Sequence, residues 1–323
     1  MVLACVGLGR GVIAENGLAV ISRLCAARST GGVVRMGKRI GLLVAVAVIG
    51  AAAATGARAA YPGRDGRIGF LGGRGGGSGE TFHGVWLVSA SGGRLHRVPG
   101  IPNMVDSFSI SPGGKQIAFV AANAKQVEID TIATGKVRAV ASVRPNTAAP
   151  VWSPNGARIA YAASGAIHVI NVNTGGGVVI CHRCGGTLAW STRGEIAYAR
   201  PGRSIFVVPA RGGRRRRITD APRGQTDGQE DWSPDGATLV FVRGNAAAIH
   251  LFTVHADGTG LHEVTGIPRN PGTPAYSPDG TKIVFEPVNL GTLWLMRADG
   301  SHPHALKIPG FSPTDPDWQP LHR

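Results

Sequence analysis

The sequence lacks the pattern of a helical protein. No long segment combines Ala, Leu, Glu and Lys at helical spacing, and only 6% of the 323 residues are aromatic, whereas 49 residues are glycine. Short apolar runs instead alternate with Gly, Pro, Asn and Asp, which is typical of many short β-strands. The composition therefore predicts an all-β protein, with length for one large or two medium domains.

Motifs that identify several enzyme classes are also missing. The chain has no His-Glu-x-x-His motif, no complete phosphate-binding Gly-x-x-x-x-Gly-Lys-Ser/Thr loop, no dinucleotide-binding Gly-x-Gly-x-x-Gly and no Gly-x-Ser-x-Gly elbow. The glycine-rich stretch "GGRGGGSG" at 72–79 stands between two expected strands, so we interpret it as a loop. We therefore expect no catalytic residues, no metal site and no cofactor.

The N-terminal part has the pattern of an export signal. Residues 36–59 begin with Met36, Lys38 and Arg39, continue as an apolar run over 40–54, and end with small residues at Ala57 and Ala59. This order predicts a signal peptide that is cleaved after Ala59. The alternative is an uncleaved membrane anchor, for which 18 apolar residues are marginally long enough. Because a signal peptide normally starts its chain, we interpret 1–35 as a non-native extension and 60–323 as the folded domain.

The positive charge is smaller in the expected domain than in the whole chain. The formal charge is +15, and removing 1–59 takes away seven basic residues and one acidic residue, so 60–323 carries +9. Many of the remaining basic residues, including the "RRRR" run at 214–217, fall in or beside the last strand of a repeat unit. Charge on such edge strands prevents edge-to-edge pairing, and it also suits an anionic partner.

A repeated motif organises the chain from residue 60 onward. An aromatic or apolar residue precedes Ser-Pro-Asp-Gly, or a relic of it, and a β-run follows. Copies occur at 108–120, 150–162, 188–199, 230–242 and 274–286, with serines 38 to 44 residues apart: Ser111, Ser153, Ser191, Ser233 and Ser277. Each copy is followed by two further strand-like runs, which makes four antiparallel strands per unit. Four strands at this period are the signature of a β-propeller blade.

The two ends of the repeat region complement each other. "RDGRIGF" at 64–70 matches the second half of the motif, and "DPDWQP" at 315–320 supplies only its first strand. We therefore expect six blades, with the C-terminal strand joining the N-terminal blade and closing the ring. The motif aromatics, Trp152, Trp190, Trp232, Tyr276 and Trp318, are expected to pack between blades rather than bind a ligand.

The motif and its period resemble the TolB-type β-propellers built of WD-like Pro-Asp repeats, over essentially all of 61–323. The resemblance implies the fold with high specificity, but related propellers include binding proteins, peptidase propellers and some sugar-acid lyases. We expect no TolB-type N-terminal domain, because the first blade begins within five residues of the predicted cleavage site.

Two cysteines, Cys181 and Cys184, end the fourth strand of the third blade in "CHRC". In an exported protein, this pair is expected to form a disulfide that fixes the shortest repeat interval. A redox-active Cys-x-x-Cys and a zinc site are the alternatives.

Acidic residues gather in the loops expected at the mouth of the propeller, where ligands usually bind. The candidate binding residues are Asp106, Asp227, Glu230, Asp231, Arg269, Asn270, Asp315 and Asp317. Asp231 and Asp317 occupy a position that is Ala189 or Ala275 in other blades, so the pair before Trp232 is the first place to look for function.

These observations predict an exported, non-catalytic binding or scaffold module in the periplasm, cell wall or extracellular space. Its expected partner is a cell-envelope protein or an anionic surface polymer. We expect a monomer without stable membrane insertion after cleavage, and no nucleic-acid partner because no stacking platform accompanies the basic residues. The alternative is a lyase or hydrolase that acts on a cell-surface polymer from the propeller mouth.

Overall fold

A computed structural model describes residues 60–73, 84–121, 126–143, 150–200, 204–288 and 290–321. The predicted extension (1–35) and signal peptide (36–59) lie outside these residues. The regular structure within them is entirely β, in strands labelled β1 to β24. No helix of the described residues has the length and apolarity to cross a membrane.

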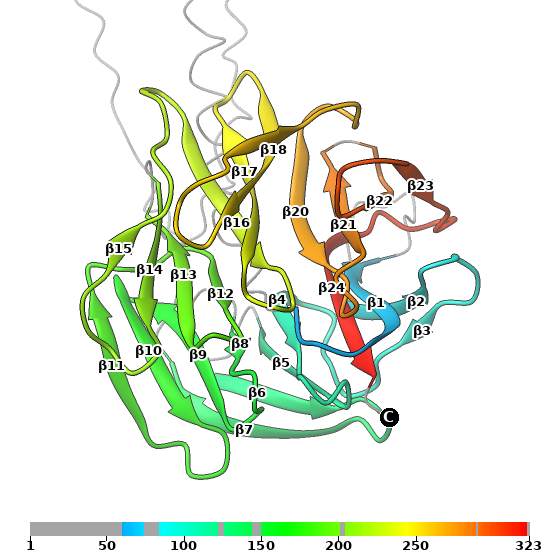
Figure 1. The fold of residues 1–323 in the computed structure, drawn as a ribbon. Coiled ribbons are helices and arrows are strands. Elements are labelled where there is room, and N and C mark those ends of the chain that lie inside the picture. The colour runs from blue at the N-terminus through cyan, green and yellow to red at the C-terminus, as the bar shows by residue number, and fades with distance from the viewer. Residues whose placement is uncertain are drawn as a thin grey trace, which may run out of the picture. The chain divides into compact units, whose positions relative to one another are not determined.

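The strands form six antiparallel sheets of four, which confirms the predicted six-bladed propeller (Figure 1). Blade 1 contains β24 (Thr314–Leu321), β1 (Arg64–Gly72), β2 (Gly84–Ser89) and β3 (His96–Arg97). Blade 2 contains β4 (Val105–Ile110), β5 (Gln116–Ala121), β6 (Gln126–Thr131) and β7 (Lys136–Ser142). Blade 3 contains β8 (Val151–Trp152), β9 (Arg158–Ala163), β10 (Ala166–Asn171) and β11 (Gly177–His182).

The other three blades repeat this order from the innermost strand to the outermost. Blade 4 contains β12 (Leu188–Trp190), β13 (Glu195–Ala199), β14 (Ile205–Pro209) and β15 (Arg216–Arg217). Blade 5 contains β16 (Thr226–Trp232), β17 (Thr238–Gly244), β18 (Ile249–His255) and β19 (His262–Val264). Blade 6 contains β20 (Pro271–Tyr276), β21 (Lys282–Pro287), β22 (Leu293–Arg297) and β23 (His304–Leu306).

The ring closes through the last strand of the chain, as the sequence predicted. β24 pairs with β1, so that Trp318 lies opposite Ile68 and Leu321 opposite Arg64. The innermost strands of consecutive blades contact one another around the ring, including β20 with β24 and β24 with β4. At the seam, Lys282 Nζ of blade 6 lies 2.8 Å from Asp65 Oδ2 of blade 1.

The Ser-Pro-Asp-Gly motif forms the predicted turn between the first two strands of a blade. In blade 5, the Asp235 carboxylate accepts hydrogen bonds from Ser233 Oγ at 2.6 Å and from Ala237 N at 2.9 Å. Gly236 N donates to Ser233 O, and its φ of 67° is one that glycine adopts without steric cost. The aspartate therefore stabilises its own turn.

The motif aromatics pack in the core, as expected. Trp152 and Trp232 are fully buried, and Trp190, Tyr276 and Trp318 are nearly so. Trp152 Nε1 also donates to Ser109 O of the preceding blade at 3.2 Å. The aromatic position thus joins neighbouring blades by burial and, in blade 3, by a hydrogen bond.

One buried position breaks the repeat. Asp130 of β6 is fully buried, while the same position in other blades holds an apolar residue: Val88, Ile170, Val208, Val254 or Met296. Within the described residues, neither carboxylate oxygen of Asp130 has a hydrogen-bond partner. Burial raises the pKa of Asp130 to about 6, since a low-dielectric site disfavours the charged form.

The ionised Asp130 side chain should therefore destabilise the propeller. We expect Asp130→Val to raise the free energy of unfolding by about 1–3 kcal/mol at pH 8, because it removes an unpaired buried carboxylate. The folded-state pKa lies above the unfolded one, so the penalty is complete above about pH 6 and vanishes below about pH 4. Urea unfolding at pH 8 and pH 4 measures both effects. A less stable variant at pH 8 would show that the carboxylate makes a favourable interaction.

Candidate functional site

The eight predicted mouth residues lie in or just before four innermost strands. Six of them precede a strand or lie in its first half, whereas Glu230 and Asp231 are the fifth and sixth of the seven residues of β16. Asp106 belongs to β4, Asp227, Glu230 and Asp231 to β16, and Asp315 and Asp317 to β24, while Arg269 and Asn270 immediately precede β20. Innermost strands cross a propeller in one direction, so their starts share one face of the ring. Asp106 and Arg269 are exposed and Asn270 is half-buried, whereas the other five are buried.

Asp231 and Asp317 join neighbouring blades. Asp231 Oδ2 accepts a hydrogen bond from Tyr276 N at 2.8 Å, and Asp317 Oδ2 accepts one from Ile110 N at 2.7 Å. In both cases the donor is the backbone amide at the motif-aromatic position of the next blade. A charged acceptor strengthens such a bond, and losing it would leave a buried N–H unpaired. The break in the repeat at these two positions therefore has a structural explanation.

A second set of inter-blade contacts lies two residues earlier in the same strands. Thr187 Oγ1 accepts from Gln229 N at 3.2 Å, and Gln229 Oε1 accepts from Thr273 N at 2.8 Å. Thr273 Oγ1 then donates to Glu286 Oε2, which also accepts from Asp315 N at 3.0 Å. These contacts run from blade 4 through blades 5 and 6 to blade 1. Three of them use a side chain to satisfy a backbone donor of the following blade, and the Thr273–Glu286 bond joins two side chains within blade 6.

The second set depends on β-bulges. Gln229, Thr273 and Asp315 all have positive φ, at 54°, 40° and 53°. In β16 and β20, the strand pairing shifts register across these residues. A bulge bends the strand and redirects the side chain, at a cost for a non-glycine residue in the left-handed region. The inter-blade hydrogen bonds hold the three residues in this conformation.

Asp227 forms a buried ion pair that sequence analysis did not foresee. Its carboxylate accepts from Arg243 Nε at 2.6 Å and from Arg243 Nη2 at 2.8 Å, and both side chains are buried. The Arg243 guanidinium also lies 5.1 Å from the ring centre of Phe252. Removing one partner of a bidentate, buried ion pair strongly destabilises the fold, because the other charge is left buried without compensation. Only cross-strand pairing of β16 with β17 brings these residues together, so the sequence alone could not show it.

Tyr61 also belongs to this region, although no sequence motif marks it as a site residue. It is buried among residues of blades 2 to 4, and its hydroxyl donates to Trp152 O at 2.5 Å. Burial raises the pKa of Tyr61 well above its usual value, and the carboxylates of Asp317 and Asp231 raise it further. Trp152, Asp317 and Asp231 belong to the innermost strands of three different blades. Tyr61 therefore lies within the ring, among the strands that surround the channel.

Glu230 is a fully buried carboxyl group of the site, and its pKa is raised. Its Oε2 accepts from Thr187 Oγ1 at 2.7 Å. Burial raises the pKa of Glu230 to about 7, although hydrogen bonds from Thr187 and backbone amides oppose the shift. Burial favours the neutral, protonated carboxyl group over the carboxylate, because the charged form loses more solvation free energy. Glu230 can therefore hold or release a proton near neutral pH.

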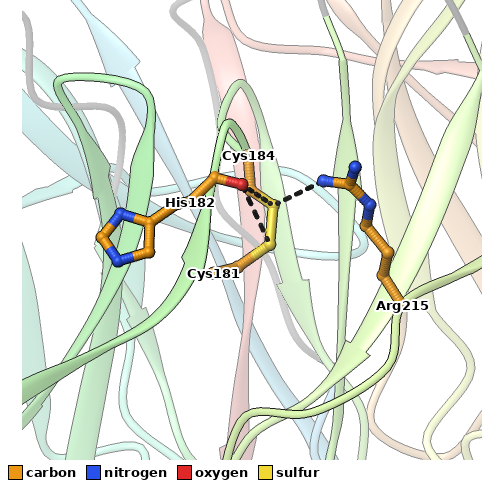
Figure 2. Close-up of a disulfide and its surroundings, with 4 residues drawn as sticks. All are labelled: Cys181, His182, Cys184 and Arg215. Atoms are coloured by element: carbon orange, nitrogen blue, oxygen red, sulfur yellow. Dashed lines mark hydrogen bonds between the residues drawn. A yellow bond between two sulfur atoms is a disulfide. The ribbon is translucent and has the colours of Figure 1, made fainter.

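A disulfide joins Cys181 and Cys184, whose Cα atoms are 5.8 Å apart (Figure 2). The bond links the end of β11 to the connection toward blade 4, where the sequence analysis expected it. Arg215 of blade 4 points toward it, with Nη1 3.6 Å from Cys184 Sγ. This contact brings the basic segment of blade 4 next to the end of β11.

The arrangement divides the predicted residues into two groups. Asp227, Glu230, Asp231, Asp315 and Asp317 are buried, and all five accept or donate hydrogen bonds that join strands or blades. Asp106, Arg269 and Asn270 are the members that solvent reaches. Among the described residues, no three His, Cys, Asp or Glu side chains gather as a metal site would require.

The pH dependence of stability should report the proton on Glu230. Because its folded-state pKa of about 7 exceeds the unfolded value, ionising Glu230 disfavours the fold. We expect the free energy of unfolding to decrease between about pH 5 and pH 8, with a contribution from this residue of up to about 3 kcal/mol. Glu230→Gln should remove that contribution, whereas Glu263→Gln on the exposed outer strand of blade 5 should leave it. Identical pH profiles for wild type and Glu230→Gln would refute the assignment.

Comparison with known proteins identifies a family whose model matches most of this chain. The TolB beta propeller domain model (PD40) matches residues 54–322. Uncharacterized protein Atu1656 of Agrobacterium fabrum is 26% identical over 66% of this chain and 72% of its own length. TolB from Acinetobacter baumannii superposes with a TM-score of 0.67 at 19% identity, covering 79% of this chain and 67% of that one.

An oligogalacturonate lyase solved in complex with manganese has the same fold, with a TM-score of 0.51 at 12% identity over 76% of this chain and 85% of that one. TolB and an oligogalacturonate lyase thus share this architecture, and similarity at such identity establishes the fold alone. The match of the family model to nearly all of 60–323 shows that the chain belongs to the TolB beta propeller domain family.

Proposed function

We propose that the domain is an exported, non-catalytic binding module of the cell envelope that recognises a partner protein at the mouth of the propeller. The observation that carries the proposal is the division of the mouth residues into buried and exposed groups. The buried carboxylates of Asp231 and Asp317 accept hydrogen bonds from backbone amides of neighbouring blades, and that of Asp227 is paired with Arg243. Their hydrogen bonds stabilise a rigid ring, which is what a recognition surface requires.

The exposed group suits polar recognition of a protein segment. Asp106 offers a carboxylate, Arg269 a guanidinium, and Asn270, which follows Arg269 in the sequence, an amide. Asn270 is held in place because its Oδ1 accepts from Ile249 N at 3.1 Å, and its φ is 54°. Groups of both signs on a rigid scaffold favour a partner with complementary charges and steer its approach. Export is inferred from the signal pattern at 36–59.

The alternative, a lyase or hydrolase acting on a surface polymer, requires a catalytic set at the same mouth. It is supported only by the shared fold of the lyase, and fold does not imply function. Incubation of the purified protein with acidic polysaccharides, with and without divalent metal, tests it. Polymer cleavage would replace the binding proposal.

Site-specific photocrosslinking in the native host tests binding at the mouth. We expect a photoreactive amino acid in place of Arg269, or of Asp106, to give a discrete adduct with an envelope protein. The same probe in place of Leu261, an exposed residue at the outer edge of blade 5, is the matched control and should give none.

The adduct at position 269 should also weaken when Asp106→Arg reverses another exposed charge of the mouth. Equal adducts from positions 269 and 261, or none from either mouth position, would contradict the proposal. Sequencing the N-terminus of the isolated protein tests export separately: a chain that begins at Ala60 is expected, and one that begins at Met1 or Met36 would argue against it.

A further inference from the structure

The outer strand of blade 3 differs from those of the other blades. The outer strands β3, β15, β19 and β23 span only two or three residues, and β7, which is longer, carries Lys136 and Arg138. β11 spans six residues, Gly177–His182, and contains no Lys, Arg, Asp or Glu. Short length and charge are the usual protections of an edge strand against pairing. β11 has neither, and among the strands that the structure describes it is the outermost of its sheet, with none beyond it (Figure 1).

The side chains of β11 are apolar and open to solvent. Val178 is 64% exposed and Val179 is 41% exposed. Since successive side chains of a strand point to opposite faces, both faces of this edge are apolar. Exposed apolar residues on an unpaired edge are typical of a surface that binds another strand.

A groove runs along one face of this edge. It has a volume of about 490 Å³ and lies between β7 of blade 2, at Val140, and the sheet of blade 3. Its floor on blade 3 is a cross-strand row of Tyr161, His168 and Val179. The Tyr161 and His168 rings stack with centroids 5.0 Å apart. A strand added beyond β11 would continue this row and place alternate side chains above the groove.

The end of β11 has a basic flank. Arg215 reaches the disulfide at Cys184 (Figure 2), and Gly212 packs close to Ile180, where an added Cβ would lie 3.6 Å from the Ile180 carbonyl oxygen. The segment 211–217 therefore lies beside the C-terminal end of β11. Six arginines there are exposed to solvent: Arg183, Arg211, Arg214, Arg215, Arg216 and Arg217. Arg216 and Arg217 form ion pairs with Glu195 and Asp220. A charge-free, apolar edge thus ends in a concentration of positive charge.

We propose that the free edge of β11 is a second binding site, which takes an extended peptide as a fifth strand of blade 3. The peptide pairs antiparallel to β11, as all other strands of the blade do, so its N-terminal end lies at the basic flank. It carries acidic residues at that end and alternating apolar residues after them. A second copy of this chain does not fit as well, because the residues before its β11, Asn-Thr-Gly-Gly at 173–176, would lie at the flank and include no acidic residue.

Binding of synthetic peptides to the full-length protein tests the proposal. The probe is a fluorescent peptide of sequence Glu-Glu-Thr-Val-Thr-Val-Thr-Val, and the comparison peptide carries the two Glu residues at its C-terminal end instead. We expect fluorescence anisotropy to give a Kd on the order of 10–100 µM for the probe and binding at least several-fold weaker for the comparison peptide. Added salt should weaken binding of the probe, because the flank attracts its acidic end.

Two substitutions with a matched control localise the peptide. Val178→Lys places a charge on the edge and should weaken binding at least about tenfold, while Leu261→Lys, at another exposed apolar residue in blade 5, should change it less than about twofold. Arg214→Glu should weaken the probe more than the comparison peptide. Circular dichroism and thermal unfolding confirm that each variant is folded.

Hydrogen exchange on the wild-type protein gives a readout that does not depend on variants. Bound probe should slow exchange of the amides of Gly177–His182 and of no other outer strand. The proposal is overturned by absence of binding up to about 1 mM peptide, by equal binding to the Val178→Lys variant, or by protection at another edge. Sedimentation that shows a dimer formed through β11 would also overturn it in favour of a second copy.

Discussion

The structure depends on the pairing of its last strand, β24, with its first strand, β1. Until β24 lies beside β1, the first blade lacks its innermost strand and the ring has an open seam. Pairing places Trp318 opposite Ile68 and brings Asp317 to the amide of Ile110 in blade 2. The side-chain contacts that run through blades 4, 5 and 6 end at Asp315 of the same strand. One strand therefore completes the sheet of blade 1 and the contacts with both of its neighbours.

This constraint changes the interpretation of the acidic mouth. A carboxylate that accepts a hydrogen bond from a buried amide of the next blade has a structural function, whatever else it does. The chain uses such carboxylates in blades 1 and 5, and it has an unpaired one at Asp130. Buried ionisable groups thus have opposite effects on stability, depending on whether the fold supplies a donor. In the proposed function, recognition at the mouth therefore falls to the residues that the ring leaves exposed.

The fold could be predicted from the sequence because every blade repeats it. The Ser-Pro-Asp-Gly turn and the aromatic before it recur at a nearly constant interval, and their local chemistry, such as Asp235 capping its own turn, is independent of distant residues. For the site, the sequence indicates which residues belong to the mouth, but not which of them are buried or what they contact. The Asp227–Arg243 pair and the location of Tyr61 arise from packing between strands or blades, for which the sequence carries no local signal. The sequence shows that Glu230 and Asp231 depart from the residues at the same positions in most other blades. Their hydrogen bonds to Thr187 and Tyr276 become visible only when neighbouring blades are in place.

Shortening the chain tests the central claim, that β24 closes the ring. We compare the full-length protein, a chain that ends at Leu321 as a control, and a chain that ends at Pro313 and so lacks β24, by thermal unfolding at neutral pH. The account predicts that the control unfolds like the full-length protein. The chain without β24 should lose its cooperative transition or unfold at least about 15 °C lower, because Ile68 and the other residues that Trp318 covers become exposed. An unchanged transition temperature in that chain would contradict the account.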